Sequence, residues 1–382
     1  MTAPPRWAWV EIDLGALTHN VGYLRGLAAP ADLWAVVKAD GYGHGAIEVA
    51  RAALAAGAKG LAVALTQEGS ALRLAHIEAP ILILSEQPPD HAASIVEHHL
   101  TPTVYTMRGI RAMAAAVADR PDRWRDLFCP YPVHIKLDTG MHRVGARPED
   151  LAALVDLVDE NADFLRVEAV FTHMAVADEP ADPYTARQLD RFTEAIAGIW
   201  PGPTHAANSA GLMVHPPARQ AMVRAGIALY GIAPGPELAE VSQGLRAVLS
   251  LHAKVSFVKR LRAGDALSYG LRHTLTQDAT IATVPIGYAD GVPRRLYLNG
   301  GCVLVNGQRC SIVGAITMDQ LMVDCGDMEV RVGDAVVLIG SQGDEHITAA
   351  EWAQRLGTIA YEIVCGISSR VPRRYVPAPS PS

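Results

Sequence analysis

The apolar positions of the chain follow one pattern up to about residue 230 and a different one after it. In the first part, short runs rich in β-branched residues alternate with stretches whose apolar residues recur at helical spacing. Short continuous apolar runs are typical of parallel strands that are buried on both faces. The expected strands are residues 33–37, 60–65, 81–84, 101–105, 133–137, 167–172, 204–207 and 222–225.

Eight strand–helix units over about 200 residues are typical of a TIM-type (β/α)8 barrel. The alternative is an open doubly wound sheet, which needs fewer strands and usually has a GxGxxG turn that this sequence lacks. We therefore predict an α/β fold with a barrel domain over residues 1–237. A further alternating stretch, residues 7–13, is expected to be a strand, and the pattern does not decide which domain it joins.

Helical spacing nearly disappears from residue 248 onward, where short alternating strands take over. Asn306 and Gly307 lie between two apolar strands and are typical of a type I′ hairpin turn. We predict a mostly antiparallel all-β C-terminal domain over residues 238–382, with one helix at 348–356. Its expected strands are residues 251–258, 266–269, 280–285, 302–305, 309–313, 321–324 and 335–339.

Charge and composition exclude several classes of partner. The 382 residues carry a net charge of −7, so we expect neither nucleic acid nor an anionic membrane as a partner. No apolar run approaches the ~20 residues that span a bilayer, and the first residues lack a signal-peptide core, so we expect a cytoplasmic protein. The five cysteines form no CxxC pair, which favours free thiols over disulfides or a metal site.

Lys38 directly follows the first buried strand, in the stretch VVKADGYGHG. Asp40, Gly41 and Gly43 break the strand, and the residues from Ala46 onward are typical of a helix. Lys38 therefore lies at the carboxyl end of a strand, where parallel α/β folds place their chemistry. The plain alternative is a strand-end lysine that reaches water.

Two later strands also carry polar residues at their ends. Lys136 lies in the fifth strand, and Asp138 and Arg143 follow it in the motif VHIKLDTGMHRVG. A buried ammonium group is unfavourable, so Lys136 is expected to snorkel or to pair with Asp138. His173 follows the sixth strand, where a hydrogen-bonded core histidine is the alternative.

The seventh and eighth strands end in features that suit a phosphate group. Asn208 and Ser209 begin the helix after the seventh strand, and helix starts bind anions well. Arg224 ends the eighth strand and is followed by Gly226 and Ile227. Because barrels often bind phosphate in the loops after these two strands, we predict a phosphorylated ligand.

These motifs, and GDALSYG, GYADGVPRR, TMDQ and YEIVCGISSRVPRRY in the second part, resemble those of alanine racemases. These are fold-type III enzymes that use pyridoxal 5′-phosphate (PLP). The resemblance runs from Trp7 to Tyr375 and departs at Thr317, where the family commonly has a cysteine. It implies an isomerase that interconverts L- and D-alanine and supplies D-alanine for cell-wall peptidoglycan.

The resemblance also implies roles for individual residues. Lys38 would hold PLP covalently and serve as the base on one face of the substrate, while Tyr269 would serve on the other. Lys136 would be carbamylated and would orient Arg143. The implied cofactor-binding residues are Lys38, Tyr42, His173, Asn208, Ser209, Arg224, Gly226, Ile227 and Tyr361. The implied substrate-binding residues are Arg143, Met318 and Tyr288.

Racemisation removes the α-proton from one face and returns it to the other, so it needs two opposed groups. A free phenol has a pKa near ~10 and needs positive neighbours to act as a base. His173 and Arg224 are the expected neighbours of Tyr269. By the resemblance, Tyr269 reaches the site of the other subunit, which implies a homodimer with shared active sites.

Other functions stay open on the sequence alone. The side chain accepted is not fixed, so a racemase of serine or of broader specificity is one alternative. A fold-type III amino-acid decarboxylase is another, and it would release carbon dioxide. A non-catalytic, barrel-only PLP carrier would lack the second domain, which is as large as a domain in its own right.

Overall fold

The computed structural model describes residues 6–377, which form two compact units. Of these residues, one unit contains 6–15, Tyr42–Gly45 and 247–377. The other contains Ala16–Gly41 and Ala46–Arg246. The predicted domain boundary at residue 238 lies between the last barrel strand and the first strand after it, and it stays a prediction.

The larger unit contains, within the described residues, eight parallel strands in sequential order, as predicted. Backbone hydrogen bonds close the two four-stranded sheets of the described chain into a barrel, from Thr101 to Ile81 (2.8 Å) and from Arg224 to Ala207 (3.0 Å). The strands are β2 (Asp32–Val36), β3 (Gly60–Val63), β4 (Ile81–Ile83), β5 (Thr103–Val104), β6 (Tyr131–Lys136), β7 (Leu165–Phe171), β8 (Thr204–His205) and β9 (Met222–Ala225). The expected (β/α)8 barrel is confirmed.

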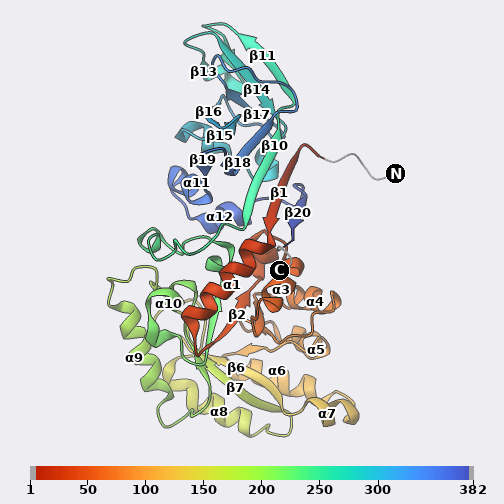
Figure 1. Cartoon of the computed structure of the whole chain (residues 1–382). Coiled ribbons are helices and arrows are strands. Elements are labelled where there is room, and N and C mark those ends of the chain that lie inside the picture. The colour runs from red at the N-terminus through yellow and green to blue at the C-terminus, as the bar shows by residue number, and fades with distance from the viewer. Residues whose placement is uncertain (1–5, 378–382) are drawn as a thin grey trace, which may run out of the picture. The chain divides into compact units, whose positions relative to one another are not determined.

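The helices of this unit surround its strands in Figure 1. They are α1 (Leu14–Ala28), α3 (Ala46–Ala55), α4 (Thr66–Leu74), α5 (Ala92–Glu97), α6 (Met107–Ala118), α7 (Asp122–Phe128), α8 (Leu151–Asp159), α9 (Tyr184–Ile196) and α10 (Ser209–Val214). Apolar helix residues such as Val49, Ile110 and Leu154 are buried, which shows that the apolar stripes of the helices face inward. Over residues 6–377, no helix is both long and apolar enough to cross a membrane.

The β-rich unit is built on a large, mostly antiparallel sheet. Its strands are β1 (Ala8–Asp13), β10 (Leu249–Lys254), β11 (Phe257–Leu261), β14 (Ala279–Val284), β15 (Cys302–Val305), β16 (Gln308–Val313), β17 (Leu321–Asp324), β18 (Ala335–Gln342), β19 (Glu345–Ile347) and β20 (Arg373–Val376). Strand β1, whose domain the sequence left open, pairs antiparallel with β10 and parallel with β20. Asn306 and Gly307 have φ angles of 49° and 76°, as a type I′ turn requires.

Two helices, α11 (Ala349–Leu356) and α12 (Ala360–Cys365), complete the β-rich unit together with a small hairpin of β12 (Ala266–Leu267) and β13 (His273–Thr274). The single strand expected over 251–258 is wrong, because the chain breaks into β10 and β11. The strand expected over 266–269 is too long, since β12 ends at Leu267 and Tyr269 begins a 3-10 turn, Tyr269–Leu271.

Candidate active site

Lys38 opens a left-handed turn, α2 (Lys38–Tyr42), at the carboxyl end of β2. The φ angles of Ala39, Asp40, Gly41 and Tyr42 are all between 51° and 61°. A non-glycine residue adopts this conformation at a cost of roughly 1–2 kcal/mol. Strain of this kind persists only where neighbouring groups hold it, and it is concentrated at functional sites.

Two carboxylates hold this turn in place. Glu68, in the first turn of α4, accepts hydrogen bonds from the backbone N–H groups of Ala39 (2.6 Å) and Ala64 (2.8 Å). Asp40 accepts from the backbone N–H of Ala46 (2.8 Å), which fixes the start of α3. We did not predict Glu68 from the sequence; its place in the first turn of a helix after a barrel strand was the available signal.

The segment Tyr42–Gly45, which begins at the last residue of this turn, belongs to the β-rich unit. It places Tyr42 beside Tyr361, and both are expected cofactor residues. The rings of Tyr42 and Tyr361 lie 6.1 Å apart, and burial, followed by the nearby Tyr361, raises the pKa of Tyr42. Arg373 donates two hydrogen bonds to the carbonyl of Gly43 (3.0 and 3.1 Å). Gly43 has a φ of 80°, and a Cβ there would lie 2.3 Å from the carbonyl oxygen of Val364, so no other residue fits.

Four cations gather at the carboxyl ends of the barrel strands. Lys136 is buried at the end of β6, and burial, followed by Arg224, Arg143 and Lys38, lowers its pKa to about 7. Its ammonium lies 5.6 Å from the centre of the Phe171 ring. A site with this much positive charge suits an anionic ligand and disfavours a protonated Lys136.

The expected alternative, an ion pair between Lys136 and Asp138, is not formed among the described residues. The Asp138 carboxylate instead accepts hydrogen bonds from the backbone N–H groups of Gly140 (3.0 Å) and His142 (3.0 Å). It therefore shapes the loop that carries Arg143 rather than neutralising the lysine.

Arg224 is held by several acceptors deep in the barrel. Its Nη2 donates to the carbonyls of Thr172 (2.9 Å) and Ala206 (2.9 Å) and lies 3.3 Å from Nδ1 of His173, while its Nη1 donates to His205. Burial lowers the pKa of Arg224 to about 9. Its Nε–H donates to no acceptor within residues 6–377, so that group can donate to a ligand.

His173 contributes a neutral ring beside this guanidinium. Burial, followed by the charge of Arg224, holds the pKa of His173 well below its usual value. The guanidinium can only donate hydrogen bonds, so Nδ1 of His173 accepts from it and the ring proton is on Nε2.

Ser209 organises the loops after β8 and β9. Its hydroxyl oxygen accepts hydrogen bonds from the backbone N–H groups of Gly226 (2.8 Å) and Ala228 (3.3 Å), and the side chain is buried. Asn208 caps α10 by accepting from the backbone N–H of Gly211 (2.9 Å). Ile227 follows Gly226 in a buried 3-10 turn, and the Ser209 O–H stays available as a donor.

This set of groups fits PLP. The cofactor is anionic at its phosphate and its phenolic oxygen, and the barrel ends supply cations together with hydroxyl and backbone donors. The side chain of Lys38 is an amine, which is the kind of group that PLP-dependent enzymes use to bind the PLP aldehyde.

Tyr269 lies in the β-rich unit on a strained and exposed turn. Its side chain is 75% exposed. The preceding Ser268 has a φ of 63° and donates a hydrogen bond from its hydroxyl to the carbonyl of Ala315 (2.7 Å). Together with Thr317 and Met322, Tyr269 lines an open groove of about 520 Å³.

Tyr288 and Met318 are brought together in the same unit, and both side chains are about half exposed. The backbone N–H of Tyr288 donates to the carbonyl of Thr317 (3.0 Å), and that of Ala289 donates to the carbonyl of Met318 (3.0 Å). The hydroxyl of Thr317, the residue that departs from the family pattern, donates to the carbonyl of Gln320 (2.8 Å). The departure therefore preserves the turn that presents Met318.

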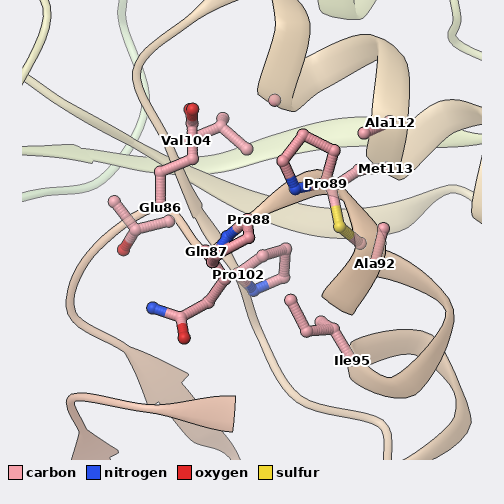
Figure 2. Close-up of a pocket in the computed structure, with 12 residues that line it drawn as sticks. Glu86, Gln87, Pro88, Pro89, Ala92, Ile95, Pro102, Val104, Ala112 and Met113 are labelled. Atoms are coloured by element: carbon pink, nitrogen blue, oxygen red, sulfur yellow. The ribbon is translucent and has the colours of Figure 1, made fainter.

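A separate cavity lies between the loop after β4 and helices α5 and α6 (Figure 2). Its volume is about 10 Å³, which is room for roughly one water molecule. Pro88, Pro89, Ala92 and Met113 give it a mostly apolar wall. It is too small for a substrate, so we exclude it as the active site.

Comparison with known proteins finds similarity to alanine racemases along most of the chain. Residues 12–234 match the family model of the alanine racemase N-terminal domain, and residues 248–375 match that of the C-terminal domain. An alanine racemase of Symbiobacterium thermophilum is 46% identical over 376 residues, covering 97% of both chains.

Solved structures agree with this. Alanine racemase from E. faecalis matches with a TM-score of 0.90 and 40% identity, covering 97% of this chain and 98% of that one. The Bacillus anthracis enzyme, solved with bound L-Ala-P, matches with a TM-score of 0.90 and 39% identity, covering 98% of this chain and 96% of that one. The chain therefore belongs to the alanine racemase family, whose members are isomerases that use pyridoxal 5′-phosphate.

Proposed function

We propose that this protein interconverts L- and D-alanine by a two-base proton transfer at the carboxyl ends of the barrel strands. The observation that carries the proposal is the clustering of Lys38, Arg143 and Arg224 around the buried amine of Lys136, whose pKa is lowered by burial and by these three positive charges. Such a cluster favours an anionic ligand, and PLP is the cofactor of the family. Alanine is the substrate named for the relatives.

PLP supplies an electron-withdrawing ring that acidifies the α-proton of a bound amino acid. We assign its phosphate to Ser209, Asn208, Tyr42, Tyr361 and the backbone of Gly226 and Ile227. The assignment rests on the buried hydroxyl of Ser209, which already orients two backbone N–H groups and keeps its own proton to donate.

Arg224 is proposed to donate its Nε–H to the ring nitrogen of the cofactor, with His173 lying against the ring. A guanidinium cannot accept a proton or a hydrogen bond, so the ring nitrogen would stay unprotonated. An unprotonated ring withdraws electrons less strongly, which favours prompt return of the proton over transamination.

Lys136 is proposed to carry a carbamate. Its neutral amine is favoured by burial and by three neighbouring cations, and the nitrogen of a neutral amine adds to carbon dioxide and releases one proton to solvent. The resulting anion would pair with Arg143 and hold it toward the phenolic oxygen of the cofactor and the carboxylate of the substrate. Met318 and Tyr288 complete the substrate side in this proposal.

Lys38 and Tyr269 are proposed as the two bases. Lys38 takes the proton on one face of the α-carbon, and Tyr269 serves the other. The exposure of Tyr269 is consistent with a group that completes the site of a second subunit, so we propose a homodimer with shared sites. We place this enzyme in the cytoplasm, where its D-alanine would supply peptidoglycan synthesis.

Incubation with a panel of L-amino acids, followed by chiral chromatography, tests this function. We expect D-alanine to form faster than any other D-isomer, and the reverse reaction to form L-alanine. Faster formation of D-serine would identify a serine racemase, and release of carbon dioxide would identify a decarboxylase; either result contradicts the proposal.

A further inference from the structure

A line of polar side chains crosses the interior of the barrel and ends at Arg224. Glu168 Oε2 lies 3.2 Å from Nε2 of His134, and Nδ1 of His134 lies 3.0 Å from Nε2 of His205. Nδ1 of His205 is hydrogen-bonded to Nη1 of Arg224. Both histidines and Arg224 are buried, with side chains at most 3% exposed.

The chemistry of these groups determines which one donates and which one accepts in each hydrogen bond of the line. Arg224 can only donate, so Nδ1 of His205 accepts. Burial lowers the pKa of both histidines, so each ring carries one proton. The proton of His205 is therefore on Nε2 and is donated to His134, whose own proton is on Nε2 and is donated to Glu168.

A β-bulge places the carboxylate at the end of this line. Val133 pairs with Val167, but the next residue of β6, His134, pairs with Ala169, so Glu168 is the extra residue of β7. Bulges re-aim side chains and are features of functional regions. The hydrogen bond from His134 is the main reason that the pKa of Glu168 is lowered, which keeps this group a carboxylate.

Phe171 packs against two members of this line, His205 and Arg224. Its ring stacks on that of His205, with centroids 4.4 Å apart and an angle of 11° between the planes. The guanidinium carbon of Arg224 lies 5.1 Å from the centre of the same ring. A tilt of His205 would therefore meet the Phe171 ring on one side and disturb the bond to Arg224 on the other.

We infer that Glu168 is a positioning residue, which fixes the tautomers of His134 and His205 and thereby orients Arg224 and offsets its buried charge. Its effect on catalysis rests on the proposed contact of Arg224 with the cofactor ring. The direction of the line does not depend on that contact.

Neutron diffraction from crystals of the full-length protein, with and without PLP, tests the direction. We expect a deuteron on Nε2 and none on Nδ1 of both His134 and His205. A deuteron on Nδ1 of either ring, or on both nitrogens of one ring, would overturn the inference. This readout holds even if the protein proves not to racemise alanine, so the two proposals can fail separately.

Substitutions test the contribution to catalysis. Glu168→Gln keeps the shape but removes the charge, and we expect kcat/KM for alanine to fall by about tenfold at unchanged PLP content. The control is Arg166→Gln, which removes the other partner of Glu168 (2.9 Å) and leaves the bond to His134; we expect a change below about twofold.

Histidine ring spectra accompany these rate measurements. In ¹⁵N-labelled Glu168→Gln protein, the Nε2–H resonance of His134 should move upfield, because the bond to a charged acceptor is the stronger one. Should Glu168→Gln fold poorly, Glu168→Asp carries the same test with a shorter carboxylate. Wild-type activity together with wild-type ring resonances in either variant would overturn the inference.

Discussion

At the scale of single residues, Lys136 illustrates how surroundings change the chemistry of a side chain. An exposed lysine is protonated at neutral pH, with a pKa near ~10.4. Burial and the charges of Arg224, Arg143 and Lys38 lower the pKa of Lys136 to about 7, so a large fraction of the amine is neutral at physiological pH. A neutral, buried amine with cationic neighbours is well suited to form a carbamate.

Carbamylation of Lys136 should therefore depend on pH. Because the protonated form dominates below the lowered pKa, we expect the carbamate to appear as the pH rises through about 7 and to be lost below it. Carbon-13 spectra in labelled bicarbonate should show one carbamate signal that Lys136→Met abolishes. Lys259→Met, at an exposed position, is the control and should keep the signal. An unmodified amine in wild-type protein at pH 8 would contradict this prediction.

Ser209→Ala should weaken the phosphate site and the fold together. The change leaves the backbone N–H groups of Gly226 and Ala228 without their acceptor, which should cost about 1–3 kcal/mol in the free energy of unfolding. PLP affinity, followed by fluorescence titration, should fall at least about tenfold. Ser94→Ala, on the outer helix α5, should change neither quantity. Unchanged PLP affinity in Ser209→Ala would remove this residue from the site.

Position at a strand end was sufficient to predict several barrel residues from the sequence. Lys38 and Ser209 follow buried strands and Arg224 lies near the end of one, and the barrel brings such ends together. The contacts of His134 could not be predicted, because its hydrogen-bonded neighbour His205 is 71 residues away. A polar residue inside a buried strand signals a partner but does not identify it.

At the scale of elements, the left-handed turn α2 determines the backbone conformation directly after Lys38. Lys38 is followed by consecutive residues with positive φ, and the carboxylates of Glu68 and Asp40 hold them. Apolar periodicity predicts where a strand ends, but it carries no information on the handedness of the turn that follows. In the sequence, only Gly41 and Gly43 indicated that this turn adopts positive φ angles.

Gly43→Ala should destabilise the protein. A Cβ there would lie 2.3 Å from a backbone carbonyl oxygen and would sit at a φ of 80°. We expect a loss of about 1–3 kcal/mol in the free energy of unfolding, measured by denaturant titration. Gly22→Ala is the matched control: it lies in α1 with no atom within 4 Å of the new Cβ, and it should stabilise by up to about 1 kcal/mol. Equal stability of the two variants would contradict this account of the turn.

The predicted strand over 266–269 failed for a related reason. Ser268 has a φ of 63° and its hydroxyl is bound to Ala315, so the chain turns before Tyr269. Alternating side chains continue through this point in the sequence, so the pattern extended the strand by two residues. The hydrogen bond that ends the strand joins Ser268 to Ala315, which is 47 positions away in the sequence.

At the scale of the whole molecule, both fold types were predicted from the sequence, and the placement of β1 was not. Strand β1 precedes the barrel in the chain, yet it pairs with β10 and β20 of the β-rich unit. The register Val10 to Arg373 joins residues 363 positions apart. Local patterns cannot choose between such distant partners, whereas the order of barrel strands follows the order of the sequence.

We predict that the protein is a dimer in solution. Tyr269, Tyr288 and Met318 each expose 42% or more of their side chains in the single chain, although all three are assigned to the active site. Exposed aromatic and methionine side chains are typical of interfaces. Light scattering after size exclusion should give twice the 40.7 kDa mass of one chain. A monomer of full activity would contradict shared sites.

The most direct test of the central claim, a shared site with Lys38 and Tyr269 as its two bases, is complementation between inactive subunits. Lys38→Ala and Tyr269→Phe proteins should each lose activity by at least about a hundredfold. After the two proteins are mixed and exchange subunits, each hybrid dimer has one site with both bases and one with neither. We predict that activity returns, to about half the wild-type rate per hybrid dimer. If native mass spectrometry finds the hybrid and no activity returns, the bases do not come from different subunits and the account is wrong.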